Sequence, residues 1–167
     1  MRAQPRPTPT CKTFSTHSTH AAGTVGYFYN DKPAPTTADM LGYTGSEEIM
    51  IYDWYSGHLS LLAATNNIAP GYEGHIYAVT APIVSGWAFI GEVDKYVTAS
   101  KLRFPEVTTS GGKLTATVSV VAGETVKVCA ARSRDMKMIC NTFTFKATGE
   151  QTTTFWGQTT TFFGWSW

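Results

Sequence analysis

Three residues within one short segment have the side-chain types of a nucleophilic catalytic triad. Asp53, Ser56 and His58 follow one another closely in the chain. Members of such triads normally converge from distant parts of a sequence, and no G-x-S-x-G nucleophile motif is present. A turn rich in polar residues accounts for the three residues better than catalysis does.

Two histidines offer the spacing of a metal-binding pair. His17 and His20 form an HxxH pattern, and Cys11 is the nearest other residue that could ligate a metal. On a helix this spacing can bind zinc, but the surrounding segment lacks helical periodicity and has no third ligand close by. We therefore expect no metal site.

Acidic residues could also form the carboxylate pair of a glycoside hydrolase, which needs two carboxyl groups about 5–10 Å apart. The candidates are Glu47, Glu48, Glu73, Glu92 and Asp94. Solvated carboxylates in turns are the simpler interpretation. The sequence also contains no phosphate-binding glycine loop and no dinucleotide fingerprint. We expect a protein that is not an enzyme and that uses no cofactor.

Aromatic residues are the most informative group, with 5 Trp, 8 Tyr and 9 Phe in 167 residues. Several lie near predicted loops or strand ends, where an exposed ring can stack on a sugar or anchor a protein partner. The alternative for each is that it fills the core. The candidate ligand-binding residues are Trp54, Tyr55, Tyr72, Tyr77 and Trp87.

Composition limits the classes of function and of fold. The net charge is +1, which argues against a specific nucleic-acid binder and against electrostatic attachment to a membrane. No apolar run approaches the roughly 20 residues of a membrane span. Only 15% of residues are charged, while Thr, Ser and Gly are abundant. Because threonine is β-branched, this mixture favours strands over helices.

Short strand patterns separated by turn signals occur along most of the chain. Residues 1–24, which contain three prolines, indicate an extended arm, and the first structured segment is Val25–Tyr29. Residues 25–150 are expected to form one antiparallel β-sandwich, jelly-roll-like, with very little helix beyond a weak signal at Thr37–Leu41. The predicted strands are 48–54, 58–63, 75–80, 87–93 continued by 96–98, and a three-strand meander formed by 113–120, 125–129 and the segments 136–140 and 142–146.

Two cysteines flank the predicted last turn of this meander. If the segment between Cys129 and Cys140 is a hairpin, the two residues can face each other and form a disulfide. The alternative is two separate thiols in a reduced protein, because three cysteines do not determine the redox compartment.

The C-terminal segment 151–167 contains a direct repeat. The sequence QTTTFWG at Gln151–Gly157 is followed by QTTTFFG at Gln158–Gly164 and then by Trp165-Ser166-Trp167. Uncharged, β-prone segments of this kind pair readily with open sheet edges, which predicts an assembly strand. The alternative is a final hairpin of the same domain, turning at Gly157. The candidate assembly residues are Phe155, Trp156, Phe162, Phe163, Trp165 and Trp167.

The alternating strands Lys113–Val121 and Thr125–Cys129, together with the segment Trp87–Thr98, resemble in style the coat proteins of small icosahedral RNA viruses. They resemble in particular the protruding β-sandwich domain of tombusvirus-like capsids. Such coat proteins usually carry an arm rich in Arg and Lys, whereas residues 1–24 hold only Arg2, Arg6 and Lys12. The resemblance therefore implies a surface or protruding domain without the RNA-binding part, located on a virion or outside the cell.

Two functions of different classes follow as expectations. The first is a non-enzymatic structural β-domain of a capsid or similar surface assembly, a homo-oligomer that attaches to a host receptor. The second is a secreted, lectin-like carbohydrate-binding module. A small secreted hydrolase is the third and least supported alternative.

Overall fold

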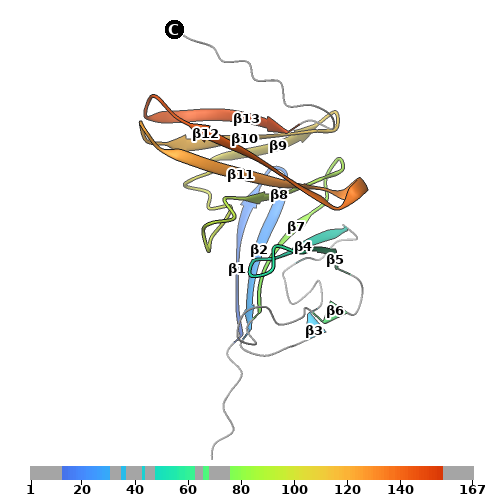
Figure 1. Cartoon of the computed structure of the whole chain (residues 1–167). Coiled ribbons are helices and arrows are strands. Elements are labelled where there is room, and N and C mark those ends of the chain that lie inside the picture. The colour runs from blue at the N-terminus through green and yellow to red at the C-terminus, as the bar shows by residue number, and fades with distance from the viewer. Residues whose placement is uncertain are drawn as a thin grey trace, which may run out of the picture.

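The computed structural model describes residues 13–30, 35–36, 43, 48–62, 66–67 and 76–155 (Figure 1). Within them, every regular element is a β-strand except one short 3₁₀ turn, η3 (Ser133–Asp135). All strand pairs are antiparallel. The predicted fold class, an all-β antiparallel sandwich with very little helix, is confirmed. No helix in the described part of the chain has the length and apolar character needed to cross a membrane.

The strands follow one another through the whole described chain. In order they are β1 (Thr13–His20), β2 (Gly23–Asn30), β3 (Pro35–Thr36), β4 (Ile49–Asp53), β5 (Leu59–Leu61), β6 (Asn66–Asn67), β7 (Ile76–Pro82), β8 (Trp87–Gly91), β9 (Glu106–Ser110), β10 (Lys113–Val120), β11 (Thr125–Arg132), β12 (Lys137–Thr144) and β13 (Gly149–Phe155).

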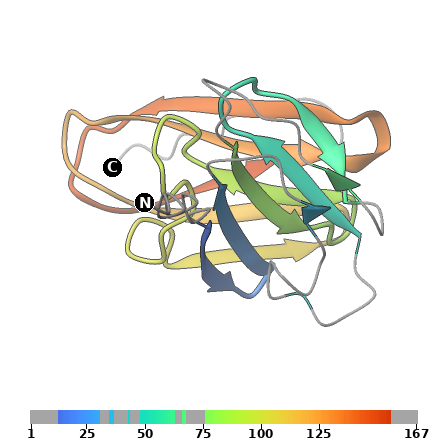
Figure 2. The same cartoon turned by 90° about the horizontal axis from the view of Figure 1, so that it is seen from below.

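These strands form three main sheets and one small sheet. The orders are β1-β2-β7-β4-β5, β13-β10-β9, β12-β11-β8 and β3-β6. Figures 1 and 2 show the strands of the five-stranded sheet running across the long strands β10 to β13. One large hydrophobic core is shared by the three main sheets.

The pattern of strand β10 shows how the sequence builds this core. Leu114, Ala116, Val118 and Val120 point inward and are buried, while the threonine and serine residues between them point outward. This is the period-2 alternation of a strand with one buried face. Burial of an aliphatic side chain of this kind stabilises the fold by about 1.5–3 kcal/mol.

Strand β7 differs because both of its faces are buried, over its whole length. Tyr77, Val79 and Ala81 face the main core, and Ile76 and Ala78 face a second, smaller cluster. In that cluster the Tyr43 hydroxyl lies 2.9 Å from carbonyl oxygens of two different strands. Strand β7 is therefore the central, fixed element from which a surface site can be positioned.

The N-terminal boundary of the domain differs from the prediction. Residues 1–24 were expected to form an extended arm, but Thr13–His20 is strand β1, paired along its length with β2. Strand β1 lies at the edge of the sheet, and its side chains from Ser15 to Thr19 are largely exposed. An edge strand of this kind needs no apolar periodicity, so its sequence carried no strand signal. The weak helix signal at residues 37–41 lies outside the described residues.

The predicted meander is also wrong in its pairing. Strands β10 and β11 lie in different sheets, because β10 pairs with β9 and β13 whereas β11 pairs with β12 and β8. The turn at residues 121–124 carries the chain from one sheet to the other. Alternation tells which residues point inward, but it does not tell which strands are neighbours. Residues 96–98, predicted to continue a strand, lie in the β8–β9 loop.

The two cysteines of the described region form a disulfide. Cys129 on β11 and Cys140 on β12 lie directly opposite each other in the register, with a Cα–Cα distance of 4.1 Å. The spacing in the sequence had predicted paired strands at these positions, and of the two alternatives the structure has the bridge.

The C-terminal prediction divides into two parts. The first repeat belongs to the domain itself, since β13 pairs with β10 over seven positions from Leu114–Phe155 to Val120–Gly149. Phe155 is buried and its ring lies 6.2 Å from that of Trp87, so its assignment as an assembly residue is wrong. The other candidate assembly residues, Trp156, Phe162, Phe163, Trp165 and Trp167, lie outside the described residues.

Candidate functional site

Four aromatic side chains from three separate segments meet at one place, which we name the aromatic cluster: Trp54, Tyr55, Tyr77 and Tyr96. Trp54 stacks on Tyr96 with ring centroids 4.9 Å apart and planes inclined by 18°. Tyr55 and Tyr77 approach Trp54 edge-on at 5.5 and 6.0 Å. Tyr77 also meets Tyr96 edge-on at 5.5 Å. The structure thus brings together three residues proposed from the sequence, Trp54, Tyr55 and Tyr77, and adds Tyr96 to them.

The turn after β4 fixes Trp54 and Tyr55. One oxygen of the Asp53 carboxylate accepts a hydrogen bond from the Tyr55 backbone N–H at 3.0 Å, and the other accepts from the Ser56 hydroxyl at 2.6 Å. The Ser56 hydroxyl in turn accepts from the His58 backbone N–H at 3.2 Å. Gly57 completes the turn with a positive φ of 72°. The three residues with triad-like chemistry therefore build a turn, as the sequence indicated.

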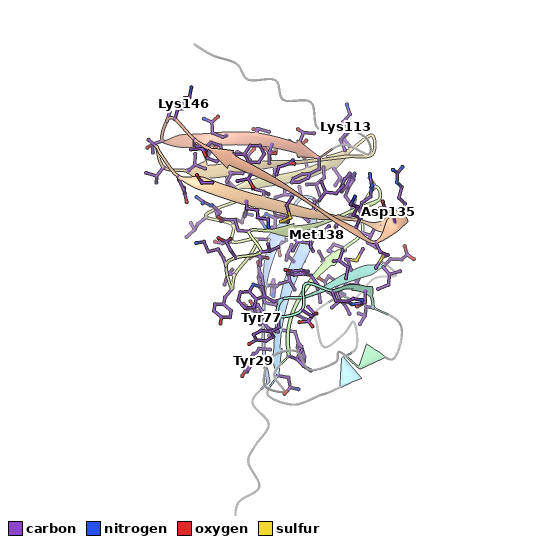
Figure 3. All side chains as sticks on the ribbon, in the orientation of Figure 1. Tyr29, Tyr77, Lys113, Asp135, Met138 and Lys146 are labelled. Carbon is purple, nitrogen blue, oxygen red and sulfur yellow. A yellow bond between two sulfur atoms is a disulfide. The ribbon has the colours of Figure 1, made fainter. Side chains whose placement is uncertain are left out.

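Tyr77 anchors the cluster to the central strand. Its side chain is buried, and its hydroxyl donates a hydrogen bond to the backbone carbonyl of Tyr96. Burial, followed by the proximity of other tyrosines, raises the pKa of Tyr77 above its ordinary value, so the phenol stays protonated as this donor requires. Figure 3 shows Tyr77 in the part of the molecule formed by β1, β2, β7 and β4.

The β8–β9 loop, residues 92–105, carries Tyr96 and is tied to the end of β8. The Glu92 N–H donates to the Thr98 carbonyl at 2.7 Å, and the Thr98 hydroxyl donates to the Ile90 carbonyl. Gly91 permits this approach: it has a φ of +88°, and a Cβ there would lie 2.0 Å from the Thr98 oxygen. Any residue other than glycine would push the loop away.

A second set of contacts ties the loop to the β1–β2 hairpin. His20 Nε2 donates to the Ala99 carbonyl at 2.9 Å, and the Ala99 N–H donates to the Tyr27 hydroxyl at 2.9 Å. The His20 ring packs edge-on against Phe89, and its Nδ1 is buried without a partner among the described residues. Burial lowers the pKa of His20 below 6.5, and nearby Lys101 lowers it further, which keeps the imidazole neutral.

An ion-pair network closes the other end of the loop. The Arg103 guanidinium contacts the buried carboxylate of Glu92 through Nε at 2.8 Å and Nη2 at 3.1 Å. It also pairs with Glu124 in the β10–β11 turn and donates to the Ser119 carbonyl at 2.6 Å. The Arg103 hydrogen bonds and charge lower the pKa of Glu124. Glu92 therefore serves a structural ion pair, in contrast to the catalytic carboxylate that was considered.

The result is a fixed loop that presents one exposed aromatic ring. Tyr96 is 62% exposed although its backbone and one ring face are held by contacts. The Trp54 indole N–H, beneath it, has no hydrogen-bond partner among the described residues. An exposed ring held in one orientation loses little conformational freedom when a ligand stacks on it. The cluster is thus suited to binding a ligand by contact with an aromatic ring.

Two further sequence candidates are Trp87 and Tyr72. Trp87 is buried, and its indole N–H donates to the Gly112 carbonyl at 2.8 Å, so it is a core residue and its assignment to a ligand site is wrong. Tyr72 lies outside the described residues.

The two histidines do not act together. Strand residues three apart point to opposite faces, and accordingly His17 is exposed whereas His20 is buried. Among the described residues, no three His, Cys, Asp or Glu side chains gather in a way that could hold a metal ion.

Tyr96 was not among the predicted site residues. The sequence places it in Asp94-Lys95-Tyr96, between two apolar segments, where it was assigned to a continued strand. The signal that could have found it is Gly91, because a glycine directly after a buried apolar run often marks a close approach or the end of a strand.

Comparison of the chain with protein-family models, with curated proteins and with solved structures gives no match.

Proposed function

We propose that this protein is a non-enzymatic β-sandwich recognition domain that binds a carbohydrate through the aromatic cluster. The observation that carries the proposal is the Tyr96 ring, which is 62% exposed, stacked on Trp54 and fixed by a loop tied to two sheets. An exposed aromatic ring held in one orientation offers apolar contact area to a ligand at little cost in conformational freedom.

A sugar suits this surface because it combines an apolar ring face with hydroxyl groups. The outer face of the Tyr96 ring can stack on the apolar face of the sugar ring. The exposed turn beside Trp54, with Ser56 and His58, offers polar groups to the sugar hydroxyls. The exposed charges next to Tyr96, on Asp94 and Lys95, are opposite and lie 4.0 Å apart, which favours a neutral ligand over an acidic one. The test below also distinguishes the alternative, in which a protein partner binds the same surface.

The absence of catalysis is part of the proposal. Both oxygens of Asp53 and the hydroxyl of Ser56 are engaged in the turn, so neither is arranged as a base or an activated nucleophile. Glu92 is paired with Arg103. These roles support binding without turnover.

A role as a structural domain of a virus capsid or similar surface assembly stays a prediction. It is compatible with a recognition domain, because a protruding domain that attaches to a host glycan would need such a site. The resemblance that suggested it rests on strands β8, β10 and β11, which serve here mainly to build the core.

The test is binding of the purified chain to a glycan array, with Tyr96→Ala as the variant and Leu102→Ala as the matched control. Leu102 lies in the same loop and is 90% exposed, so its truncation changes the apolar surface without touching the cluster. We expect the wild type and L102A to retain the same glycans and Y96A to lose them. No retained glycan, or equal retention by Y96A, would refute the proposal. Loss of a protein partner in the same Y96A variant would instead assign the surface to protein recognition.

A further inference from the structure

The aromatic cluster continues across the five-stranded sheet as a single row of side chains. Tyr29 on β2 lies directly opposite Tyr77 on β7 in the register. On the other side of Tyr77, the backbone N–H of Trp54 donates to the Tyr77 carbonyl at 2.9 Å, directly after the end of β4. Residues opposite each other on neighbouring antiparallel strands lie on the same face of a sheet. Trp54, Tyr77 and Tyr29 therefore form one row, which we name the aromatic row.

The aromatic row lies at the margin of the main core. One row further inward on the same face, all three residues are buried: Tyr27, Val79 and Tyr52. In the aromatic row Tyr77 is buried, whereas Trp54 and Tyr29 are partly exposed. Figure 3 shows Tyr29 and Tyr77 on the same side of the molecule, below the long strands β10 to β13. Both ends of the row are therefore accessible to a ligand.

Tyr29 lies too far from Tyr96 for both rings to contact the same sugar unit. Neighbouring strands are about 4.8 Å apart, so Tyr29 on β2 starts about 10 Å from Trp54, on which Tyr96 stacks. One pyranose of an extended β-linked chain is about as long as one strand spacing. The first and third units of such a chain can therefore stack on Tyr96 and Tyr29 at the same time.

The shape and the charge of this surface favour one kind of chain. The row runs straight across three neighbouring strands of one sheet, which suits a flat, extended chain better than a curved α-linked one. The opposite charges of Asp94 and Lys95, beside Tyr96, favour an uncharged chain. Chains of glucose, xylose or mannose joined by β-1,4 linkages are extended and uncharged, and their sugar rings have apolar faces.

We propose that the site binds at least three consecutive units of a neutral β-1,4-linked glycan, with one unit on Tyr96 and the next but one on Tyr29. Tyr29 then determines the preference of the site for longer chains. The inference rests on the proposed carbohydrate function, and it adds the class of glycan and a second contact.

Isothermal titration with oligosaccharides of two, four and six units tests the effect of chain length. The probes are the β-1,4-linked gluco-, xylo- and manno-oligosaccharides. In at least one series, we expect the wild type to bind the tetrasaccharide about fivefold more tightly than the disaccharide, because only the longer chain reaches both rings. The hexasaccharide should bind with little further gain.

Tyr29→Leu separates the second contact from the first. Leucine keeps an apolar side chain against the core but has no flat ring. We therefore expect Y29L to lose the fivefold gain, while its affinity for the disaccharide stays unchanged and shows that the protein is folded. The matched control, Tyr29→Phe, keeps the ring and should keep the gain; loss of the gain in Y29F would overturn stacking on Tyr29.

Two results would overturn this inference and leave the proposed function intact, provided that Y96A still loses a glycan retained on the array. One is equal affinity of the wild type for the disaccharide and the tetrasaccharide, or no binding to any of the three series. The other is an undiminished gain in Y29L. If the array retains no glycan at all, the proposed function fails together with the inference.

Discussion

A single buried histidine connects the hairpin of β1 and β2 to the loop that carries Tyr96. His20 can hold the Ala99 carbonyl through Nε2 in its neutral form, but a proton on Nδ1 would be buried with no acceptor among the described residues. Lys101 adds an unfavourable positive charge nearby. At this scale the site depends on one proton-sensitive contact.

This contact makes stability depend on pH. Because the folded-state pKa of His20 lies below 6.5, the unfolded chain binds more protons between these two values, and stability falls as the pH decreases through this window. We expect urea unfolding of the wild type to show lower stability at about pH 5 than at about pH 7.5. His20→Gln, whose amide can still donate to Ala99, should show a smaller loss. Glu124 does not account for this difference in stability between the two pH values. Its pKa is lowered from 4.5, so the stability that it contributes is lost only at more acidic pH. An identical pH dependence in both proteins would contradict this role of His20.

At the scale of elements, the β8–β9 loop carries Tyr96 and so forms the exposed part of the proposed binding surface. Its geometry depends on Gly91, where the backbone of residue 98 passes too closely for a side chain.

Gly91→Ala should therefore displace the loop. We expect a loss of at least about 2 kcal/mol in unfolding free energy, because strain at a positive φ adds to a steric overlap. Gly111→Ala is the matched control: its φ is also positive, at +55°, but nothing lies within 4 Å of its added Cβ. It should lose only about 1 kcal/mol. Equal losses in urea unfolding would show that the close approach to Thr98 is unimportant.

The same loop shows what could be predicted from the sequence and what could not. Alternation and turn residues predicted most strands, the fold class and the opposition of Cys129 to Cys140, because these depend on local period and spacing. Trp54, Tyr55 and Tyr77 were proposed from their places at or near strand ends, and the structure brings their rings together; that they bind a ligand stays a prediction. Tyr96 was missed because its position depends on contacts between segments far apart in sequence, such as that of His20 with Ala99. Pairing across sheets, including the separation of β10 from β11, depends on the same kind of distant contact.

At the scale of the whole molecule, the aromatic cluster and strand β13 lie on different parts of the fold. The aromatic cluster lies beside β7 and β4, and β13 lies on the far side of the β10 and β11 strands (Figures 1 and 3).

Truncation tests where the core part of the C-terminal segment ends. Deleting residues 156–167 leaves β13 intact, so we expect an unchanged melting temperature. Deleting residues 149–167 removes β13 and with it Phe155 from the core, which should lower stability by at least about 3–5 kcal/mol. Thermal melts followed by circular dichroism make the comparison. If the shorter deletion also unfolds the domain, the division at Phe155 is wrong.

The central claim is that the exposed face of Tyr96 binds a sugar, and isothermal titration of a glycan retained on the array tests it most directly. Tyr96→Phe keeps the ring, so its dissociation constant should stay close to that of the wild type. Tyr96→Ala should weaken binding by about tenfold, the equivalent of about 1.4 kcal/mol, since a stacked aromatic contact is worth about 0.5–1.5 kcal/mol. The same affinity in wild type and Y96A, with both proteins folded, would contradict the account.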